Sequence, residues 1–481
     1  MLVRPCAPLL VLAAFALGCE ADRESVPPVA ALSPDRSAVR AASGEWPNLH
    51  GPGGRNVAPD RRLNWDWPEA GPPVAWRVPC GTGYACPVIA ENAVVLLHRV
   101  GPDVGPFAES AAKLGGDRPV ERLAWFDLDT GAPGPVADVS ARFESEYPGH
   151  SGAPYATPAI GRRGPDGGRR VYAYGAAGLL RAVDFDTAEE LWGRDLAAET
   201  QPAEKPFATS ASPIVFQTDD GAERVLIATG GTKPNTGLTL LDGATGEMVW
   251  QAVDALESYS TPLLVEVHGR RFVVALMKTR LLIADPATGA ELGSLPFELR
   301  TVDAMNATSP AVWGDVLFVG SGPSGRTAGC MVARLEPDGS LTELWRNRRG
   351  LDPQYNSLVA ADGFVYGFGS NLNKQQKLRC LDLQTGELRW LWDDDLRRGH
   401  LLAADGKLVA LGERGLLAAL AFDPTEPRVV TRSAEPVIEG VCYTTPALAD
   451  GRLLLRTEVE LVCYDLRPGA DRSGVEPAAA Q

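Results

Sequence analysis

A short sequence pattern recurs along this chain: tyrosine, a small residue, serine or threonine, proline, and then an apolar run. Residues 155–158, 259–262 and 443–446 are clear copies, while 210–213 and 307–310 lack the tyrosine. Residues 84–87 and 355–358 each change one position, and 399–402 form a degenerate copy. Self-similarity of this kind is the signature of a repeat architecture, in which each unit buries its apolar faces against its neighbours.

Each repeat predicts four short antiparallel strands. Asp-Gly turns at 361–363, 404–406 and 449–451 separate two apolar runs, and Asp-Gly favours a hairpin because glycine accepts the positive φ of the turn. A third run ends in an acidic turn, as at 242–246, 285–289 and 382–386. A tryptophan often opens the fourth run, as do Trp192, Trp250, Trp345 and Trp390. Units of this content, repeated eight times, predict an all-β fold: an eight-bladed β-propeller of four-stranded antiparallel blades.

The two ends of the repeat region test this prediction. The last repeat stops after its third strand, at residues 463–465, and no tryptophan strand follows. The missing strand occurs before the first repeat, at residues 73–78, and contains Trp76. We therefore expect this N-terminal strand to complete the eighth blade and close the ring, which removes exposed strand edges. Two stacked smaller domains would not explain an incomplete last repeat beside a lone leading strand.

The turns carry a family resemblance. Asp-x-x-Thr-Gly followed by tryptophan four residues later occurs at 242–250 and 382–390, and it resembles the signature of the PQQ-like (quinoprotein-type) β-propeller repeat family. Residues 46–52 are similar to the Trp-Pro-x-x-Arg-Gly-Pro lead-in of planctomycete lipoprotein members, with His50 in place of the arginine. The resemblance covers residues 46–468. It implies the fold but leaves the function open, because the superfamily includes quinoprotein dehydrogenases as well as non-catalytic scaffolds such as the lipoprotein of the outer-membrane barrel-assembly machinery.

The N-terminus is interpreted as a targeting segment. Residues 1–18 combine the positive charge of Arg4 with a short apolar run, which is typical of a signal peptide. Residues 16–19 resemble a lipobox in which Cys19 is acylated, although Ala16 replaces the usual leucine. The alternative is plain secretion with Cys19 as an ordinary thiol. Residues 19–45 are predicted to be a flexible lipidated tether and 469–481 a disordered tail, so we expect a protein of the cell envelope, on the periplasmic side of a membrane, or a secreted one.

Composition and motifs argue against several functions. The net charge of −15 excludes nucleic acid as a partner, because binding it requires a basic face. The chain lacks a Cys-Cys pair, a Cys-x-x-Cys-His haem motif and a Gly-x-Ser-x-Gly elbow, and its five histidines have no metal-ligand spacing. No catalytic residue, metal or cofactor is therefore expected, with PQQ and calcium as the alternative.

The cysteines allow two interpretations. Cys380 and Cys463 each stand two residues before a turn aspartate, in a slot that alanine fills elsewhere, which favours inert buried thiols. Cys80 and Cys86 flank a glycine-containing loop and could form a disulfide in an oxidising envelope. Pairing among the six cysteines of the repeat region stays open; they are Cys80, Cys86, Cys330, Cys380, Cys442 and Cys463.

The tyrosines are the best candidates for a binding site. Of ten tyrosines, five occupy the same repeat position, just before the first strand of a blade: Tyr84, Tyr155, Tyr259, Tyr355 and Tyr443. We expect them at the mouth of the central channel, with Asn306 and His400 beside the equivalent place in blades without the tyrosine. Their rings and hydroxyls suit a flat, sugar-like or peptide ligand. The alternative is that they pack between neighbouring blades and bond to backbone.

These observations favour a non-catalytic, monomeric envelope scaffold that binds a protein partner or ligand through loops on one face of the disc. The long segments 101–122 and 136–153 are the expected binding inserts. A PQQ-dependent quinoprotein dehydrogenase and a carbohydrate or small-ligand binder at the central channel are the alternatives.

Overall fold

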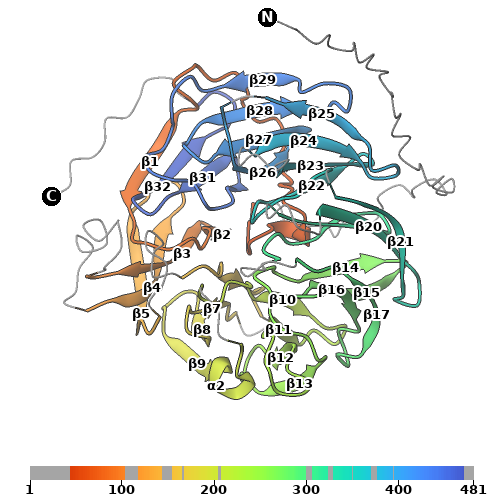
Figure 1. The fold of residues 1–481 in the computed structure, drawn as a ribbon. Helices are drawn as coiled ribbons and strands as arrows, with labels where there is room; N and C mark the ends of the chain where they lie inside the picture. The colour runs from red at the N-terminus through yellow and green to blue at the C-terminus, as the bar shows by residue number, and fades with distance from the viewer. Residues whose placement is uncertain are drawn as a thin grey trace, which may run out of the picture.

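The computed structural model is a ring of eight four-stranded antiparallel sheets (Figure 1), which confirms the predicted eight-bladed β-propeller. It describes residues 44–470 except 103–117, 144–153, 165–166, 204–206, 300–305, 323–328, 349, 370–375 and 394. The predicted signal peptide, Cys19 and the C-terminal tail lie outside the described residues. Within these described ranges, no helix has the length and apolarity needed to cross a membrane.

The blades follow one another along the chain, and each runs from the first strand at the axis to the fourth at the rim. Blade 1 contains β2 (Val88–Ala90), β3 (Ala93–Val100), β4 (Val120–Asp127) and β5 (Pro133–Ser140). Blade 2 contains β6 (Ala159–Ile160), β7 (Arg170–Tyr174), β8 (Leu179–Asp184) and β9 (Glu190–Asp195), followed by the short helix α2 (Leu196–Thr200). Blade 3 contains β10 (Ile214–Gln217), β11 (Glu223–Ala228), β12 (Leu238–Asp242) and β13 (Met248–Ala252). Blade 4 contains β14 (Leu263–Val267), β15 (Arg270–Leu276), β16 (Arg280–Ala284) and β17 (Glu291–Pro296).

The second half of the ring repeats the same order. Blade 5 contains β18 (Ala311–Trp313), β19 (Val316–Ser321), β20 (Gly329–Leu335) and β21 (Leu341–Asn347). Blade 6 contains β22 (Val359–Ala361), β23 (Phe364–Gly369), β24 (Lys377–Asp382) and β25 (Leu388–Trp392). Blade 7 contains β26 (Gly399–Ala404), β27 (Lys407–Gly412), β28 (Leu417–Ala421) and β29 (Val429–Arg432). Blade 8 contains β30 (Ala447–Ala449), β31 (Arg452–Arg456), β32 (Glu460–Asp465) and the N-terminal strand β1 (Val74–Pro79).

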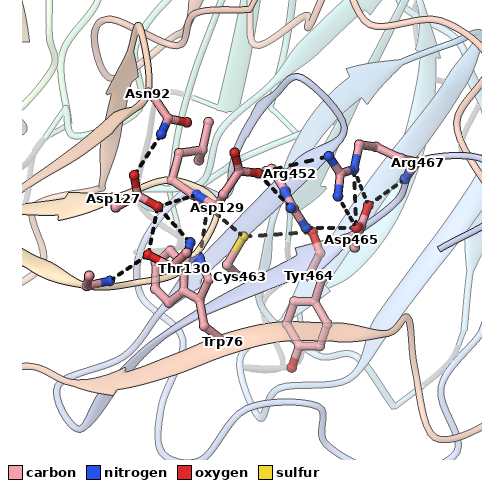
Figure 2. Close-up of polar contacts among 12 residues, drawn as sticks. Trp76, Asn92, Asp127, Asp129, Thr130, Arg452, Cys463, Tyr464, Asp465 and Arg467 are labelled. Atoms are coloured by element: carbon pink, nitrogen blue, oxygen red, sulfur yellow. Dashed lines mark hydrogen bonds and ion pairs between the residues drawn. The ribbon is translucent and has the colours of Figure 1, made fainter. Parts of the chain in front are cut away.

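Ring closure occurs as the sequence predicted. Strand β1 pairs antiparallel with β32, with Val78 opposite Leu461 and Arg77 opposite Val462. Polar contacts join this blade to blade 1 (Figure 2): the Arg452 guanidinium binds Asp465 of its own blade at 2.8 Å and Asp129 of blade 1 at 2.7 Å. The first and last parts of the propeller are therefore held together by both backbone and side-chain bonds.

The predicted Asp-Gly hairpins have the backbone geometry that the motif requires. Asp362 and Gly363, for example, have φ angles of 51° and 83°. Two consecutive positive φ values define the type I′ turn, whose twist matches that of paired strands. The same pair of positive angles occurs at Asp405–Gly406 and Asp450–Gly451.

The core lies between blades rather than within them. One apolar cluster, for instance, combines Phe272 and Ile283 of blade 4 with Leu317 and Met331 of blade 5, all fully buried. A single blade has two apolar faces and no second layer of its own, so its stability depends on both neighbours.

Tryptophans on five of the fourth strands connect their blade to the next one. Each indole N–H donates a hydrogen bond to a backbone carbonyl in the acidic turn of the following blade. These bonds are Trp76 to Leu128 (2.9 Å), Trp192 to Gly243 (3.0 Å), Trp250 to Pro286 (3.2 Å), Trp345 to Leu383 (2.8 Å) and Trp390 to Asp423 (2.7 Å). The recurring tryptophan is therefore an inter-blade contact, and this explains its regular spacing.

The turn glycine is needed beneath the tryptophan ring. Gly246 has φ +72°, and a Cβ at this position would lie 2.7 Å from the Trp192 ring. Blade 1 has no tryptophan on β5, and in the facing turn of blade 2 the glycine is replaced by Ala188, which keeps a φ of 61°. Ala188 packs in one apolar cluster with Ala137 of β5. In this turn, where no tryptophan ring packs on the backbone, alanine therefore takes the place of glycine.

Gly246→Ala is expected to destabilise the protein more than Gly269→Ala. Both glycines have φ +72°, but a Cβ at position 269 meets no atom within 4 Å. The left-handed backbone costs about 1 kcal/mol for alanine at either site, and only Gly246→Ala also displaces Trp192. Urea unfolding of the two variants should therefore differ by roughly a further 1–3 kcal/mol. Equal losses of stability would contradict the role assigned to the tryptophan.

Candidate functional site in the central channel

A belt of side chains joins the first strands of neighbouring blades around the channel. In four repeat motifs, the serine or threonine accepts a hydrogen bond from the backbone N–H of the equivalent residue in the preceding blade. Examples are Thr157 Oγ1 from Cys86 (2.9 Å), Ser212 Oγ from Thr157 (2.9 Å) and Thr261 Oγ1 from Ser212 (2.8 Å). We call these positions the channel belt; its members are Cys86, Thr157, Ser212, Thr261, Ser309, Ser357, His400 and Thr445.

The belt continues where the motif is degenerate. Ser309 Oγ accepts the Thr261 N–H at 3.1 Å, and His400 Nδ1 accepts the Ser357 N–H at 3.4 Å. Thr445 Oγ1 lies 3.2 Å from the same Nδ1, and Cys86 Sγ accepts the Thr445 N–H at 3.2 Å. A histidine and a cysteine therefore replace the hydroxyl as acceptors, which the sequence pattern alone did not indicate.

The five repeat tyrosines line a cavity of about 410 Å³ above the belt. Tyr84 stacks on Tyr155 with ring centroids 4.9 Å apart, and its ring lies edge-on to Tyr443 at 5.4 Å. Tyr355 lies edge-on to Tyr443 at 5.6 Å, and Tyr259 contacts Phe207 instead. All five are half-buried, and four of them, all except Tyr259, contact another of these tyrosines. We call this cavity the tyrosine pocket.

An N-terminal segment closes the other end of the channel. We call residues 46–58 the axial segment. Trp46 is fully buried and exchanges backbone hydrogen bonds with Ile89 of blade 1, both 2.8 Å long. The segment then crosses the axis, with the turn η1 (Pro52–Gly54) near β14, and Asn56 Nδ2 donates to the Leu358 carbonyl at 2.9 Å. Figure 1 shows this turn inside the ring.

Leu49 of the axial segment separates two cavities. It lines the tyrosine pocket and also a second cavity of about 350 Å³ that is bounded by blades 2 to 4. The tyrosine pocket is therefore closed at its base by the protein's own N-terminal chain. The sequence analysis treated residues 46–52 as a family lead-in and did not predict this position.

One arginine side chain borders the tyrosine pocket. The Arg398 guanidinium lies over the rings of Tyr355 and Tyr443, at 5.8 and 5.6 Å, a favourable cation–π geometry. It forms an ion pair with Glu413, whose Oε1 also accepts the Tyr443 hydroxyl at 3.3 Å. The positive charge at the pocket is thus balanced by a carboxylate of the same site.

The predicted site residues do not all line the tyrosine pocket. His400 lines the tyrosine pocket together with the five tyrosines. Asn306 does not, because its side-chain amide is buried and donates to the carbonyls of Met277 at 2.8 Å and Lys278 at 3.2 Å. The Asn306 amide thus supports the neighbouring blade, and a role for this residue in binding stays a prediction.

The six cysteines of the described residues are free, buried thiols. Cys80 and Cys86 do not form the disulfide considered above, because Cys80 Sγ donates to the Thr457 carbonyl at 3.1 Å while Cys86 belongs to the channel belt. Burial raises the pKa of both thiols. Cys380 and Cys463 are fully buried, and burial raises the pKa of each to about 12, as expected of inert packing thiols.

His400 is expected to make stability depend on pH. Burial lowers its pKa to about 3, whereas an unfolded histidine has a pKa near 6.5. Between these values the unfolded chain binds the extra proton, so stability falls as the pH is lowered. From pH 7 to pH 5 the loss attributable to His400 is about 2 kcal/mol. His400→Gln keeps an acceptor for the Ser357 N–H and should lose about 2 kcal/mol less than the wild type over this interval in urea unfolding. Identical pH profiles would contradict this assignment.

Comparison with known proteins places the repeats in a family. The profile of the family described as "Outer membrane protein assembly factor BamB" matches residues 153–391. These residues include the Asp-x-x-Thr-Gly turns at 242–246 and 382–386 and the tryptophans that follow them.

Residues 153–391 of the chain match the PQQ-like β-propeller repeat family.

Two curated relatives of this PQQ-like propeller are outer membrane protein assembly factors BamB. The one from Yersinia pestis is 26% identical over 265 residues, which are 52% of this chain and 62% of the relative. The one from Moranella endobia (strain PCIT) is 24% identical over 229 residues, which are 46% of this chain and 54% of the relative. The match thus spans less than two thirds of either relative's length.

Solved structures similar to this PQQ-like propeller have low sequence identity to it. BamB from Moraxella catarrhalis has a TM-score of 0.49 and 15% identity, covering 77% of this chain and 100% of its own. The quinohemoprotein alcohol dehydrogenase from Comamonas testosteroni has a TM-score of 0.45 and 11% identity, covering 92% of this chain and 83% of its own.

The donor set of the tyrosine pocket does not fit a quinone cofactor. PQQ carries three carboxylates and needs a cation to polarise its carbonyls and a carboxylate base. Among the described residues that line the pocket, Arg398 is the one charged side chain, and Glu413 neutralises it. No cluster of three His, Cys, Asp or Glu side chains in the described ranges could hold a metal ion.

Proposed function

We propose that this propeller is a non-catalytic scaffold of the cell envelope that binds a protein partner. The observation that carries the proposal is the match of its repeats to a family described as outer membrane protein assembly factors. Both curated relatives have the same description. A propeller suits this role because rigid blades present many loops on one broad surface.

We assign the partner surface to the face of the disc that carries the tyrosine pocket. The opposite face, where first and second strands meet in Asp-Gly turns, is partly covered by the N-terminal chain: Asp405 accepts hydrogen bonds from the Leu63 N–H and the Trp65 indole, both at 3.1 Å. Of the two expected inserts, residues 120–122 belong to β4 and 136–140 to β5, while 103–117 and 144–153 lie outside the described residues.

The membrane attachment is a separate part of the proposal. Acylation of Cys19 would tether the propeller through residues 20–45, and two or more acyl chains suffice for stable anchoring. Replacing Cys19 by serine would then release the protein into the soluble fraction without changing the propeller.

Site-specific photo-crosslinking tests the partner surface in the native membrane. A photoreactive residue at Arg414, in the exposed β27–β28 loop next to the tyrosine pocket, should form a discrete adduct with an envelope protein. The matched position is Asp219, whose side chain is 100% exposed in the β10–β11 turn of the opposite face, and it should form none. Adducts at Asp219 alone would place the partner on the opposite face. If neither position formed an adduct, the proposal that the propeller is a scaffold for an envelope protein would be rejected.

A further inference from the structure

The tyrosine pocket is lined by hydroxyl groups whose hydrogens have no acceptor among the described residues. Ser212, Thr261 and Ser309 of the channel belt each accept a backbone N–H, at 2.8 to 3.1 Å. A serine or threonine hydroxyl is also a donor of one hydrogen. In the described part of the chain, none of these three hydroxyls donates to a protein acceptor. Three consecutive blades therefore present free O–H donors where they line the pocket.

Further unpaired groups lie around the same pocket. The Tyr355 hydroxyl and the Ser210 hydroxyl are buried and bond to no described residue. His400 is 3% exposed, and its Nε2 also has no partner in the described ranges. Its other ring nitrogen, Nδ1, lies 3.4 Å from the Ser357 N and 3.2 Å from Thr445 Oγ1, so Nε2 is a further buried polar atom that can bond to a ligand.

Buried donors without acceptors are unfavourable. Each costs about 1–3 kcal/mol when it has neither water nor a protein partner, so native structures satisfy nearly all of them. Such groups around one pocket, the hydroxyls of Ser212, Thr261 and Tyr355 among them, indicate that the complementary molecule supplies oxygen acceptors.

The charge of the pocket restricts this molecule further. A carboxylate or phosphate would need a cation that is not already neutralised. Arg398, the charged residue of the described lining, is bound to Glu413. An uncharged ligand is therefore favoured over an anion.

The walls of the pocket indicate the shape of the ligand. Aromatic rings favour a flat apolar face, and the volume of about 410 Å³ lies in the range of small-molecule sites. Leu49 closes the base, so the ligand would enter from the tyrosine face and stop above the axial segment.

We propose that the tyrosine pocket binds an uncharged, oxygen-rich ligand with a flat apolar face, of which a pyranose sugar is the chemical class. Ring and hydroxyl oxygens would accept hydrogen bonds from Ser212, Thr261 and Ser309, and a sugar hydroxyl would bond to His400 Nε2. The apolar face of the sugar would pack on the tyrosine rings.

Isothermal titration calorimetry tests this site with cellobiose, maltose and N,N′-diacetylchitobiose as sugar probes and benzoate as a flat anion. At least one disaccharide should bind saturably at millimolar concentrations, and benzoate should not. Tyr355→Phe and Ser210→Ala should each weaken sugar binding about tenfold, the equivalent of one hydrogen bond. Neither change should lower the melting temperature, because neither hydroxyl bonds to a described residue.

Tyr464→Phe is the matched control. It removes a buried hydroxyl that bonds to the Val437 carbonyl outside the pocket, so it should lower the melting temperature and leave sugar affinity unchanged. Saturable binding of benzoate without sugar binding, no binding of any sugar, or unchanged affinity in Tyr355→Phe would each overturn the proposal. Photo-crosslinking at Arg414 reports on the protein partner independently, so each proposal can fail alone.

Discussion

Replacing Trp76 by alanine is expected to lower the free energy of unfolding by about 3–5 kcal/mol, the cost of removing a buried tryptophan. Its indole is 7% exposed, donates to the Leu128 carbonyl at 2.9 Å and covers Gly131 of blade 1. Trp76 belongs to the strand that closes the ring, so its loss should also free the edge of β32. Urea unfolding measures the first effect, and analytical ultracentrifugation measures association through the released edge.

Trp392→Ala is the matched control for Trp76→Ala. Trp392 is half-buried at the end of β25 and donates no indole hydrogen bond to another blade in the described structure. We expect a clearly smaller loss of stability and no association. If the two variants lose the same stability, ring closure does not depend on the Trp76 contact.

Arg456→Leu is expected to destabilise the protein by about 3 kcal/mol or more, because charged hydrogen bonds are lost and buried carbonyls are left unpaired. Arg456 is fully buried in β31 and donates to the carbonyls of Ala85 at 2.7 Å, Gly81 at 3.0 Å and Thr82 at 3.1 Å. These carbonyls lie in the connection from β1 to β2, which also carries Tyr84. The change should therefore weaken the tyrosine pocket as well as the fold.

Arg467→Leu is the control for Arg456→Leu, because it also removes a guanidinium charge but from an exposed position. Arg467 lies in the same blade, but its side chain is 49% exposed where it pairs with Asp465. An exposed ion pair contributes about 1 kcal/mol or less, so we expect Arg467→Leu to be nearly neutral in thermal unfolding. A comparable loss of stability in both variants would show that the hydrogen bonds of the buried Arg456 guanidinium have no special role.

Much of the fold was predictable because its signals are local. Asp362–Gly363 specifies a hairpin through the φ angles of two adjacent residues, and the alternation of apolar runs and turns sets the strands. Closure by β1 was also predictable, since an incomplete last repeat and a lone leading strand need no knowledge of distances. The tyrosines could be placed at the channel because they precede the strand next to the axis.

Other features depended on residues that approach only in the folded ring. The sequence analysis placed Asn306 and His400 beside the same repeat position, yet in the folded ring His400 takes the channel-belt position of Ser309 and faces the pocket. Asn306 lies three residues before Ser309 and bonds to the carbonyls of Met277 and Lys278. Cys86 resembled half of a disulfide in the sequence, but it accepts a hydrogen bond from Thr445, which is at the other end of the chain.

The number of blades, their strand order and the closure of the ring could be predicted from the chain alone, because periodicity and turn chemistry act within one repeat. The contents of the axis could be learned only from the folded ring. The axial segment, the channel belt and the unpaired donors of the tyrosine pocket arise from contacts between blades and from the N-terminal chain that crosses them. Such contacts depend on side-chain direction and on the path of a non-repeating segment, and neither follows a sequence period.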